Sequence, residues 1–190
     1  MRLKTPRVPP VEPESWTDEQ REIFGDLRVN GRILNIFKTL ANHPKLGKRW
    51  LVFANHIMGK STLSLRDREI LILRIGWLCK SGYEWGQHFL IGLECDLSAA
   101  EIERIKRGAD APGWTPAEQL LLRATDELHE DAFISGPTWS GLQQHYSTEQ
   151  LMDIVFTVGQ YNLVSMALNT CGVQLDSGMT LDPDLCKYQS

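Results

Sequence analysis

Apolar residues recur every three or four positions along most of the chain, a spacing typical of amphipathic helices. The alternation of apolar and polar residues that marks strands, together with hairpin turns, is missing from the pattern. The sequence therefore predicts an all-α fold, a bundle of about seven to nine helices that bury their apolar faces against one another. We expect these helices at residues 17–27, 34–43, 43–59, 64–80, 83–96, 98–107, 115–131, 135–146 and 147–173.

Hydroxyl residues mark where several of these helices begin. The capping box, in which Ser or Thr precedes Glu or Gln by three positions, occurs at Thr17 to Gln20, Ser98 to Glu101 and Ser147 to Gln150. Ser64 and Thr115 precede two further helices, the second with Pro116 at its first position. The helix that follows Ser64 is apolar around most of its circumference, which predicts a central position in the bundle.

The chain is expected to form one domain with an extension at each end. Its 190 residues match the usual size of a single domain, about 100 to 200 residues. Prolines are concentrated in residues 1–16, which predicts an extended arm that lies across a protein surface, its own or a neighbouring subunit's. The helical domain spans residues 17–175. Residues 176–190 are expected to form a poorly ordered or subunit-crossing tail.

Composition and charge narrow the class of protein. Hydrophobic residues make up 42% and charged residues 23%, as in ordinary globular domains. The net charge is −4 and the basic residues are scattered, so no nucleic acid or anionic membrane is expected as a partner. No uncharged apolar run reaches the roughly 18 residues of a membrane span, which favours a cytoplasmic protein. The four cysteines are far apart, which favours reduced thiols over disulfides.

The segment CKSGYEWGQH (79–88) carries the first candidate chemistry. Ser81-Gly82 interrupts the preceding helix, and in the helix that follows Glu84 and His88 are one turn apart on the same face. A neighbouring carboxylate raises the pKa of an imidazole, whereas burial lowers it, so this pair is expected to titrate near neutrality. The pair therefore predicts general acid/base catalysis.

Further polar residues are candidates for the same site. Glu69 lies among apolar neighbours in the preceding helix, and the Tyr83 hydroxyl is expected to donate to a developing oxyanion. Weaker candidates for substrate binding are His56, Trp85, Gln160 and Asn162. Trp85 is also a candidate for packing, and the amides of Gln160 and Asn162 for hydrogen bonds between helices.

Redox and metal chemistry are alternatives for the residues in and around this segment. Cys79 and Cys95 each lack a second cysteine at the Cys-x-x-Cys spacing, so the dithiol mechanism is excluded and a single reactive thiol is left as the alternative. Glu84 and His88 would form half of a metal site, yet no further His lies within a turn or two. We expect no metal and no cofactor.

The segment LSLRDREILILRIGWLCKSGYEWGQHFLIG resembles the core of the carboxymuconolactone decarboxylase family, which also contains the alkylhydroperoxidase D-like proteins. The resemblance extends from about residue 35 to 175, with LMDIVFTVGQYNLVSMALNTCGVQLD similar to the closing helix of the family. It implies an AhpD-like helical fold and a homo-oligomer, a trimer or a hexamer.

The family's peroxidase branch carries a Glu, two cysteines and a His at fixed spacing. At that spacing the Glu corresponds to Glu69 and the His to His88, whereas the cysteine positions correspond to Ser81 and Glu84. The resemblance therefore implies the decarboxylase branch, a cofactor-independent lyase acting on a small unsaturated lactone or keto acid. In that role His88 handles the proton, Glu84 and Glu69 orient and relay, and Tyr83 binds or donates. Decarboxylation, dehydration and isomerisation all stay open, as do a thiol-dependent peroxidase and a non-catalytic oligomer that binds small ligands.

Overall fold

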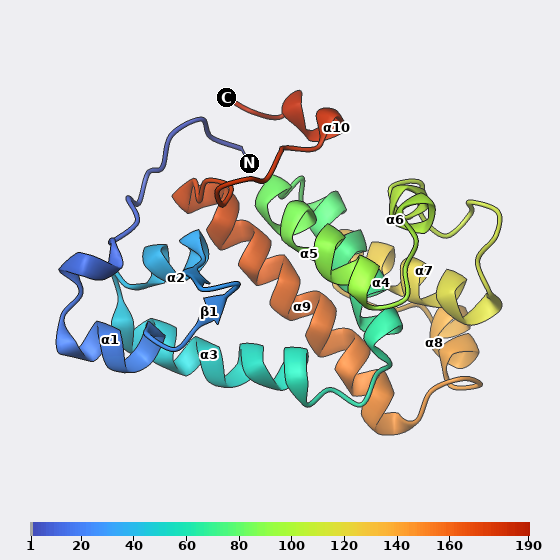
Figure 1. The fold of residues 1–190 in the computed structure, drawn as a ribbon. Helices are drawn as coiled ribbons and strands as arrows, with labels where there is room; N and C mark the ends of the chain where they lie inside the picture. The colour runs from blue at the N-terminus through green and yellow to red at the C-terminus, as the bar shows by residue number, and fades with distance from the viewer. Residues whose placement is uncertain (1) are drawn as a thin grey trace.

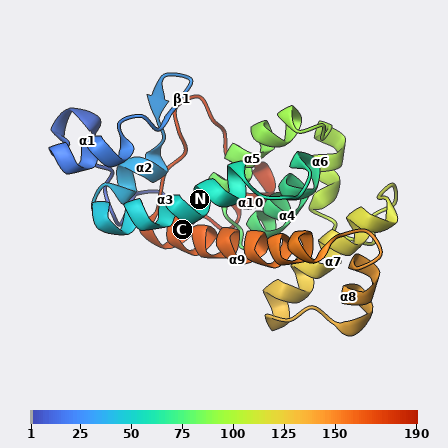
Figure 2. The same cartoon turned by 90° about the horizontal axis from the view of Figure 1, so that it is seen from below.

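The longest helix, α9 (Thr148–Cys171), crosses the molecule, and the other helices are arranged along it (Figures 1 and 2). The computed structural model describes residues 2–190. The other helices are α1 (Asp18–Phe24), α2 (Asn35–Leu40), α3 (Pro44–Gly59), α4 (Leu65–Leu78), α5 (Gly82–Glu94), α6 (Ala99–Ile105), α7 (Pro116–Asp131), α8 (Gly136–Leu142) and α10 (Pro183–Cys186), with a short 3-10 helix at Pro13–Ser15. The predicted all-α fold class is confirmed.

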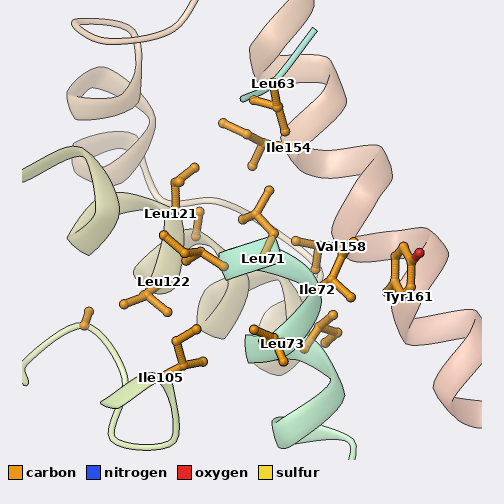
Figure 3. Packing of buried hydrophobic residues seen from close by; sticks show 14 of the residues in the cluster. Leu63, Leu71, Ile72, Leu73, Ile105, Leu121, Leu122, Ile154, Val158 and Tyr161 are labelled. Atoms are coloured by element: carbon orange, nitrogen blue, oxygen red, sulfur yellow. The ribbon is translucent and has the colours of Figure 1, made fainter. Parts of the chain in front are cut away.

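Helix α4 is the centre of the main hydrophobic core, as its apolar circumference predicted. It packs against α5, α7 and α9, and its side chains from Ile70 to Leu73 are completely buried. Figure 3 shows Leu71 and Ile72 of α4 between Leu121 of α7 and Val158 of α9. Each fully buried aliphatic side chain contributes about 1.5 to 3 kcal/mol to the hydrophobic driving force. This core fixes the position of α4, from which part of the candidate site projects.

The predicted helix starts are confirmed by the capping hydrogen bonds. Thr17, Ser98 and Ser147 each complete a capping box with the Gln or Glu three residues later. Thr115 also forms one, with Glu118, and the Ser64 hydroxyl accepts from the backbone of Asp67. Local side-chain chemistry therefore sets where these helices begin.

One element was missed by the sequence analysis, which predicted no strands. Residues Arg28–Val29 (β1) and Arg32–Ile33 (β2) pair in an antiparallel hairpin. Its turn consists of Asn30 and Gly31, both left-handed with φ of 50° and 77°. Asn-Gly is the strongest short signal for such a turn, but strands of two residues are too short to show an alternating pattern.

Both chain ends pack on the helical domain, and the two termini lie close together (Figure 1). In the arm, the backbone amides of Arg7 and Val8 donate to the carbonyl of Cys171 at 2.8 and 3.0 Å. The tail packs on the helical domain in this structure, and a crossing to a neighbouring subunit stays a prediction. The tail contains α10, whose Leu185 is 1% exposed, because burying this side chain and satisfying nearby polar groups orders the segment.

Asp176 connects the tail to two other parts of the structure. Its carboxylate accepts hydrogen bonds from the Tyr83 hydroxyl at 2.5 Å, from Gln87 Nε2 at 2.7 Å and from the backbone N–H of Asn35 at 2.8 Å. Tyr83 and Gln87 belong to α5, and Asn35 begins α2. A single tail residue therefore joins α2 to α5.

Within residues 2–190, α9 is the one helix long and apolar enough to cross a membrane, by length and composition alone. Polar residues such as Gln160 and Asn162 interrupt its apolar residues, so α9 does not show in the sequence as an unbroken apolar run. Of the apolar window, 56% is buried inside the protein, as in the core helix of a bundle. This feature is therefore weak evidence for a membrane span.

Replacing Asp176 with Ala is expected to lower the free energy of unfolding by about 2 to 3 kcal/mol, because donors to a charged acceptor lose their partner. Urea unfolding measures this value. Asp184→Ala is the matched control, since that carboxylate is 60% exposed and removing it should change stability by less than about 1 kcal/mol. Equal losses of stability from the two substitutions would contradict the role of Asp176 in joining α2 to α5.

Candidate active site

The turn between α4 and α5 places two halves of the candidate site side by side. Helix α4 ends at Leu78, Lys80 adopts a left-handed φ of 55°, and α5 begins at Gly82. A Cβ atom at Gly76 would lie 3.3 Å from Glu84 Cγ, so the absence of a side chain there lets the two helices approach closely. The predicted interruption at Ser81-Gly82 is thereby confirmed.

His88 lies between two carboxylates from different helices. Its Nδ1 atom is 2.6 Å from Glu69 Oε2 of α4, and its Nε2 atom is 3.0 Å from Glu84 Oε1, one turn earlier in α5. All three side chains are buried, and Glu69 is completely inaccessible to solvent. The structure thus brings Glu69, Glu84 and His88 together, as the helical spacing predicted for the last two.

A buried arginine completes the array. Arg68 donates from Nε and Nη2 to Glu69 Oε1 at 3.0 and 2.8 Å, and from Nη1 to the carbonyl of Met58. The sequence analysis did not single out Arg68, although a basic residue in a largely apolar helix is a usable signal for a buried ion pair. Arg68, Glu69, His88 and Glu84 therefore form a line of alternating charge when His88 is protonated.

The two carboxylates keep His88 protonated. Burial opposes the charge of the imidazolium, but the charges of Glu69 and Glu84 outweigh burial and raise the pKa of His88 to about 10. Burial likewise disfavours the charged form of Glu69, yet His88 and Arg68 lower its pKa overall. The expectation that His88 titrates near neutrality was therefore wrong, because two carboxylates flank it rather than one. At neutral pH the site holds an imidazolium that is a proton donor.

Glu84 and His88 line a cavity of about 170 Å³ between α2, α3, α5 and α9. Glu84 Oε1 contacts His88 but has no aligned hydrogen-bond partner within residues 2–190. Most of the other lining residues are apolar or aromatic: Leu34, Ile36, Phe37, Trp50, Leu51, Ala54, Met58, Ile91, Tyr161 and Val164. A mostly apolar cavity with a few convergent polar groups is the usual form of a small-molecule site.

Tyr83 also lines the cavity, but its hydroxyl is engaged elsewhere. It donates to Asp176 and accepts from the backbone N–H of Ile36 at 3.3 Å. Burial and the charge of Asp176 raise the pKa of Tyr83 well above its ordinary value. The predicted donation from Tyr83 to an oxyanion is therefore not supported by this geometry, and the hydroxyl instead holds the tail against α5.

Of the weaker binding candidates, only Gln160 lines the cavity. His56 is on the surface, with Nε2 3.8 Å from Asp153, and Trp85 donates to Asp182 while packing against Trp77. Asn162 accepts a hydrogen bond from the thiol of Cys79. His56, Trp85 and Asn162 therefore lie outside the cavity that holds Glu84 and His88, because a sequence of helical residues does not show which face meets a cavity. Their contact with a substrate stays a prediction.

Two further polar side chains line the cavity near His88, Tyr161 and Gln87. The Tyr161 ring packs edge-on against the His88 ring with 4.9 Å between centroids, and its hydroxyl contacts Met58 Sδ at 2.8 Å. Gln87 lines the same cavity one residue before His88. Tyr161 belongs to α9 and is far from His88 along the chain, so sequence spacing does not predict their contact.

The candidate redox cysteines lie outside the cavity. Burial raises the pKa of Cys79 to about 11 and also raises the pKa of Cys95. Both side chains are therefore protonated thiols at neutral pH, which are poor nucleophiles. Ser81 and Glu84 occupy the two positions at which the dithiol spacing would require cysteines.

The fold is AhpD-like. An alkylhydroperoxidase AhpD core from Ralstonia eutropha JMP134, described as an uncharacterized peroxidase-related protein, shares 18% identity over 90% of this chain and 93% of its own, with a TM-score of 0.80. An uncharacterized peroxidase-related protein from Silicibacter sp. TM1040 shares 17% identity over 90% of this chain and 90% of its own, with a TM-score of 0.77. A variant of the debrominase Bmp8, solved in complex with 2,3,4-tribromopyrrole, shares 13% identity over 92% of this chain and 94% of its own, with a TM-score of 0.76.

Residues 44–127 match the model of the carboxymuconolactone decarboxylase family. This region includes Glu69, Glu84 and His88. No match was found among curated proteins. The similarity to solved structures supports the AhpD-like fold, whereas the specific reaction has to be argued from the site.

We predict that His88 is still protonated at pH 8 and that Glu69→Gln lowers the midpoint of its titration. The ¹⁵N chemical shifts of the imidazole measure this protonation directly. Glu149→Gln, at an exposed position of α9, is the control and should leave the His88 signals unchanged. A wild-type His88 that is neutral at pH 7 would contradict the structure.

The raised pKa of His88 also predicts how stability depends on pH. This contribution to stability is complete below the unfolded-state pKa near 6.5 and is lost as the pH rises through about 10. Glu69→Gln should weaken this dependence, since Glu84 still raises the pKa of His88, and should cost about 3 to 5 kcal/mol at pH 7, because Arg68 and His88 lose a buried partner. Urea unfolding at several pH values measures both effects.

Proposed function

We propose that this protein is a lyase that uses its own side chains for proton transfer on a small unsaturated lactone or keto acid, with decarboxylation as the reaction. The observation that carries this proposal is the buried His88 imidazolium, held between Glu69 and Glu84 on the wall of an apolar cavity. Loss of carbon dioxide requires a proton donor afterwards, and the resting site holds one.

In the proposed reaction, the bond between the substrate carbon and its carboxylate breaks, and the electron pair moves into the conjugated carbonyl. The resulting enolate takes a proton at carbon from Nε2 of His88. Glu84, 3.0 Å from Nε2, returns a proton from solvent to His88, and Glu69 keeps the ring oriented through Nδ1. Positioned proton transfer of this kind contributes about 10²- to 10⁴-fold to rate.

The same groups support dehydration or isomerisation as variants of the proposal. In those reactions a base removes a proton beside a carbonyl, and the protonated His88 is unsuited to that role at neutral pH. Glu84 would then act as the base, with His88 as a hydrogen-bond donor to the carbonyl oxygen. Decarboxylation is favoured because it uses the donor already present.

A thiol-dependent peroxidase is the alternative. It is suggested by the Cys79 thiol, which lies 4.0 Å from Nδ1 of His129. The raised pKa of Cys79 and its hydrogen bond to Asn162 argue against a thiolate there. The third possibility, a non-catalytic ligand-binding oligomer, would leave the charged array without a chemical task.

We also propose that the protein forms a homo-oligomer in the cytoplasm. The support for self-association is a row of large apolar side chains on the exposed face of α9, since soluble monomers rarely expose such a row. The row consists of Met152, Phe156, Leu163 and Met166, each at least 49% exposed. Sedimentation velocity of the full chain measures the number of subunits.

His88→Ala is expected to lower the decarboxylation rate by about 10²- to 10⁴-fold, because it removes the proton donor. A Cys79→Ser/Cys95→Ser double variant should keep the activity within a few-fold. The assay measures carbon dioxide release from β-keto and unsaturated lactone acids, alongside reduction of hydroperoxides with a dithiol. Peroxide reduction that disappears in the cysteine variant would overturn the proposal in favour of the peroxidase, and ligand binding without turnover would favour the binding protein.

A further inference from the structure

The cavity beside His88 contains no positively charged side chain other than His88 itself. Among the described residues, no lysine or arginine lines it. Arg68, close behind the site, is 5% exposed and is bound to Glu69 and to the carbonyl of Met58. A carboxylate away from the reacting carbon would therefore be buried without a countercharge, and such burial is costly.

The available polar groups suit neutral oxygens. Gln160 is 5% exposed, lines the cavity, and forms no side-chain hydrogen bond within residues 2–190. Asn55 supplies a second amide at the same cavity. Amide N–H groups donate readily to a ketone or lactone carbonyl, and they provide no charge to balance a further carboxylate.

The remaining walls suit a flat apolar body. Phe37, Trp50 and Tyr161 all line the cavity, and aromatic rings pack well against other rings. A second cavity of about 130 Å³ shares Ile36, Trp50 and Val164 with the first, and no charged side chain of the described chain lines it. A substrate that extends in this direction meets further apolar walls.

A polar hollow on another side of the cavity shares Leu34 and Gln87 with it. This hollow is lined by three acidic side chains (Glu12, Glu14 and Asp176) and three basic ones (Arg28, Arg32 and Lys38). Its formal charges cancel, and Lys38 is already paired with Glu12 at 2.9 Å. The hollow therefore provides no net attraction for a second carboxylate.

We infer that the substrate has an apolar, ring-sized body and a single carboxylate, the one that reacts, as in an aryl-substituted β-keto acid. This inference rests on the proposed acid/base function and narrows its substrate class. Dicarboxylic acids of the same size are excluded by the missing countercharge, and short aliphatic acids leave the aromatic walls without contacts.

The test compares three β-keto acids: benzoylacetate, which has an aryl group and one carboxylate, acetoacetate, which is short, and 3-oxoglutarate, which has two carboxylates. Carbon dioxide release should give a kcat/KM for benzoylacetate at least about tenfold above that for 3-oxoglutarate, because a second buried carboxylate is unpaired. The value for acetoacetate should also be below that for benzoylacetate. Equal or faster turnover of 3-oxoglutarate would overturn the inference.

A designed charge tests the cause of this selectivity. Asn55 is on the exposed rim of the cavity, so the Asn55→Arg variant should fold. It should raise kcat/KM for 3-oxoglutarate relative to kcat/KM for benzoylacetate by about tenfold, as expected for one charged hydrogen bond. Val52→Arg is the matched control, since Val52 belongs to the same helix, is 73% exposed and does not line the cavity. An unchanged ratio in folded Asn55→Arg, or the same change in both variants, would contradict the inference.

Equilibrium binding separates this inference from the proposed reaction. Acetophenone, which keeps the ring and carbonyl without a carboxylate, should bind and shift the NMR signals of Tyr161 and His88, whereas glutarate should not. If no acid is decarboxylated but acetophenone binds there, the proposed reaction fails and the inferred ligand class stands. Preferential binding of glutarate overturns the inference whatever the outcome of the activity assay.

Discussion

The contact between His88 and Glu69 is the interaction on which the site depends. Its 2.6 Å separation joins α4 to α5 inside the protein, where an unpaired charge would be costly. Arg68 on one side and Glu84 on the other extend it into a line of alternating charge. The same contact therefore holds two helices together and keeps a proton donor beside an apolar cavity, so stability and the proposed chemistry rest on one arrangement.

This arrangement also gives a physical reason for treating the chain separately from dithiol members of its fold. Glu84 occupies one of the two positions where the dithiol spacing would place a cysteine, and it contacts the retained His88. A carboxylate there stabilises an imidazolium, whereas a thiol there would supply a nucleophile. Similarity to these solved structures therefore supports the fold, and the reaction has to be tested by experiment.

The features that depend on local chemistry could be predicted from the sequence. Capping boxes, the apolar circumference of α4 and the one-turn spacing of Glu84 and His88 are all set by residues within a few positions of one another. The contacts that could not be predicted join distant residues, such as Tyr83 with Asp176 and His88 with Tyr161. The pKa of His88 was misjudged for the same reason, because the second carboxylate that raises it comes from a different helix.

The pH dependence of turnover tests most directly whether the His88 imidazolium is the proton donor. Proton donation by His88 and attack by a cysteine thiolate predict opposite trends with pH. If the His88 imidazolium donates the proton, kcat/KM for benzoylacetate falls as the pH rises through about 10, and Glu69→Gln moves this fall to lower pH. If a thiolate is the reactive group, activity instead rises toward the pKa of Cys79, about 11. A rate that increases with pH, or a fall that Glu69→Gln does not move, would contradict the account.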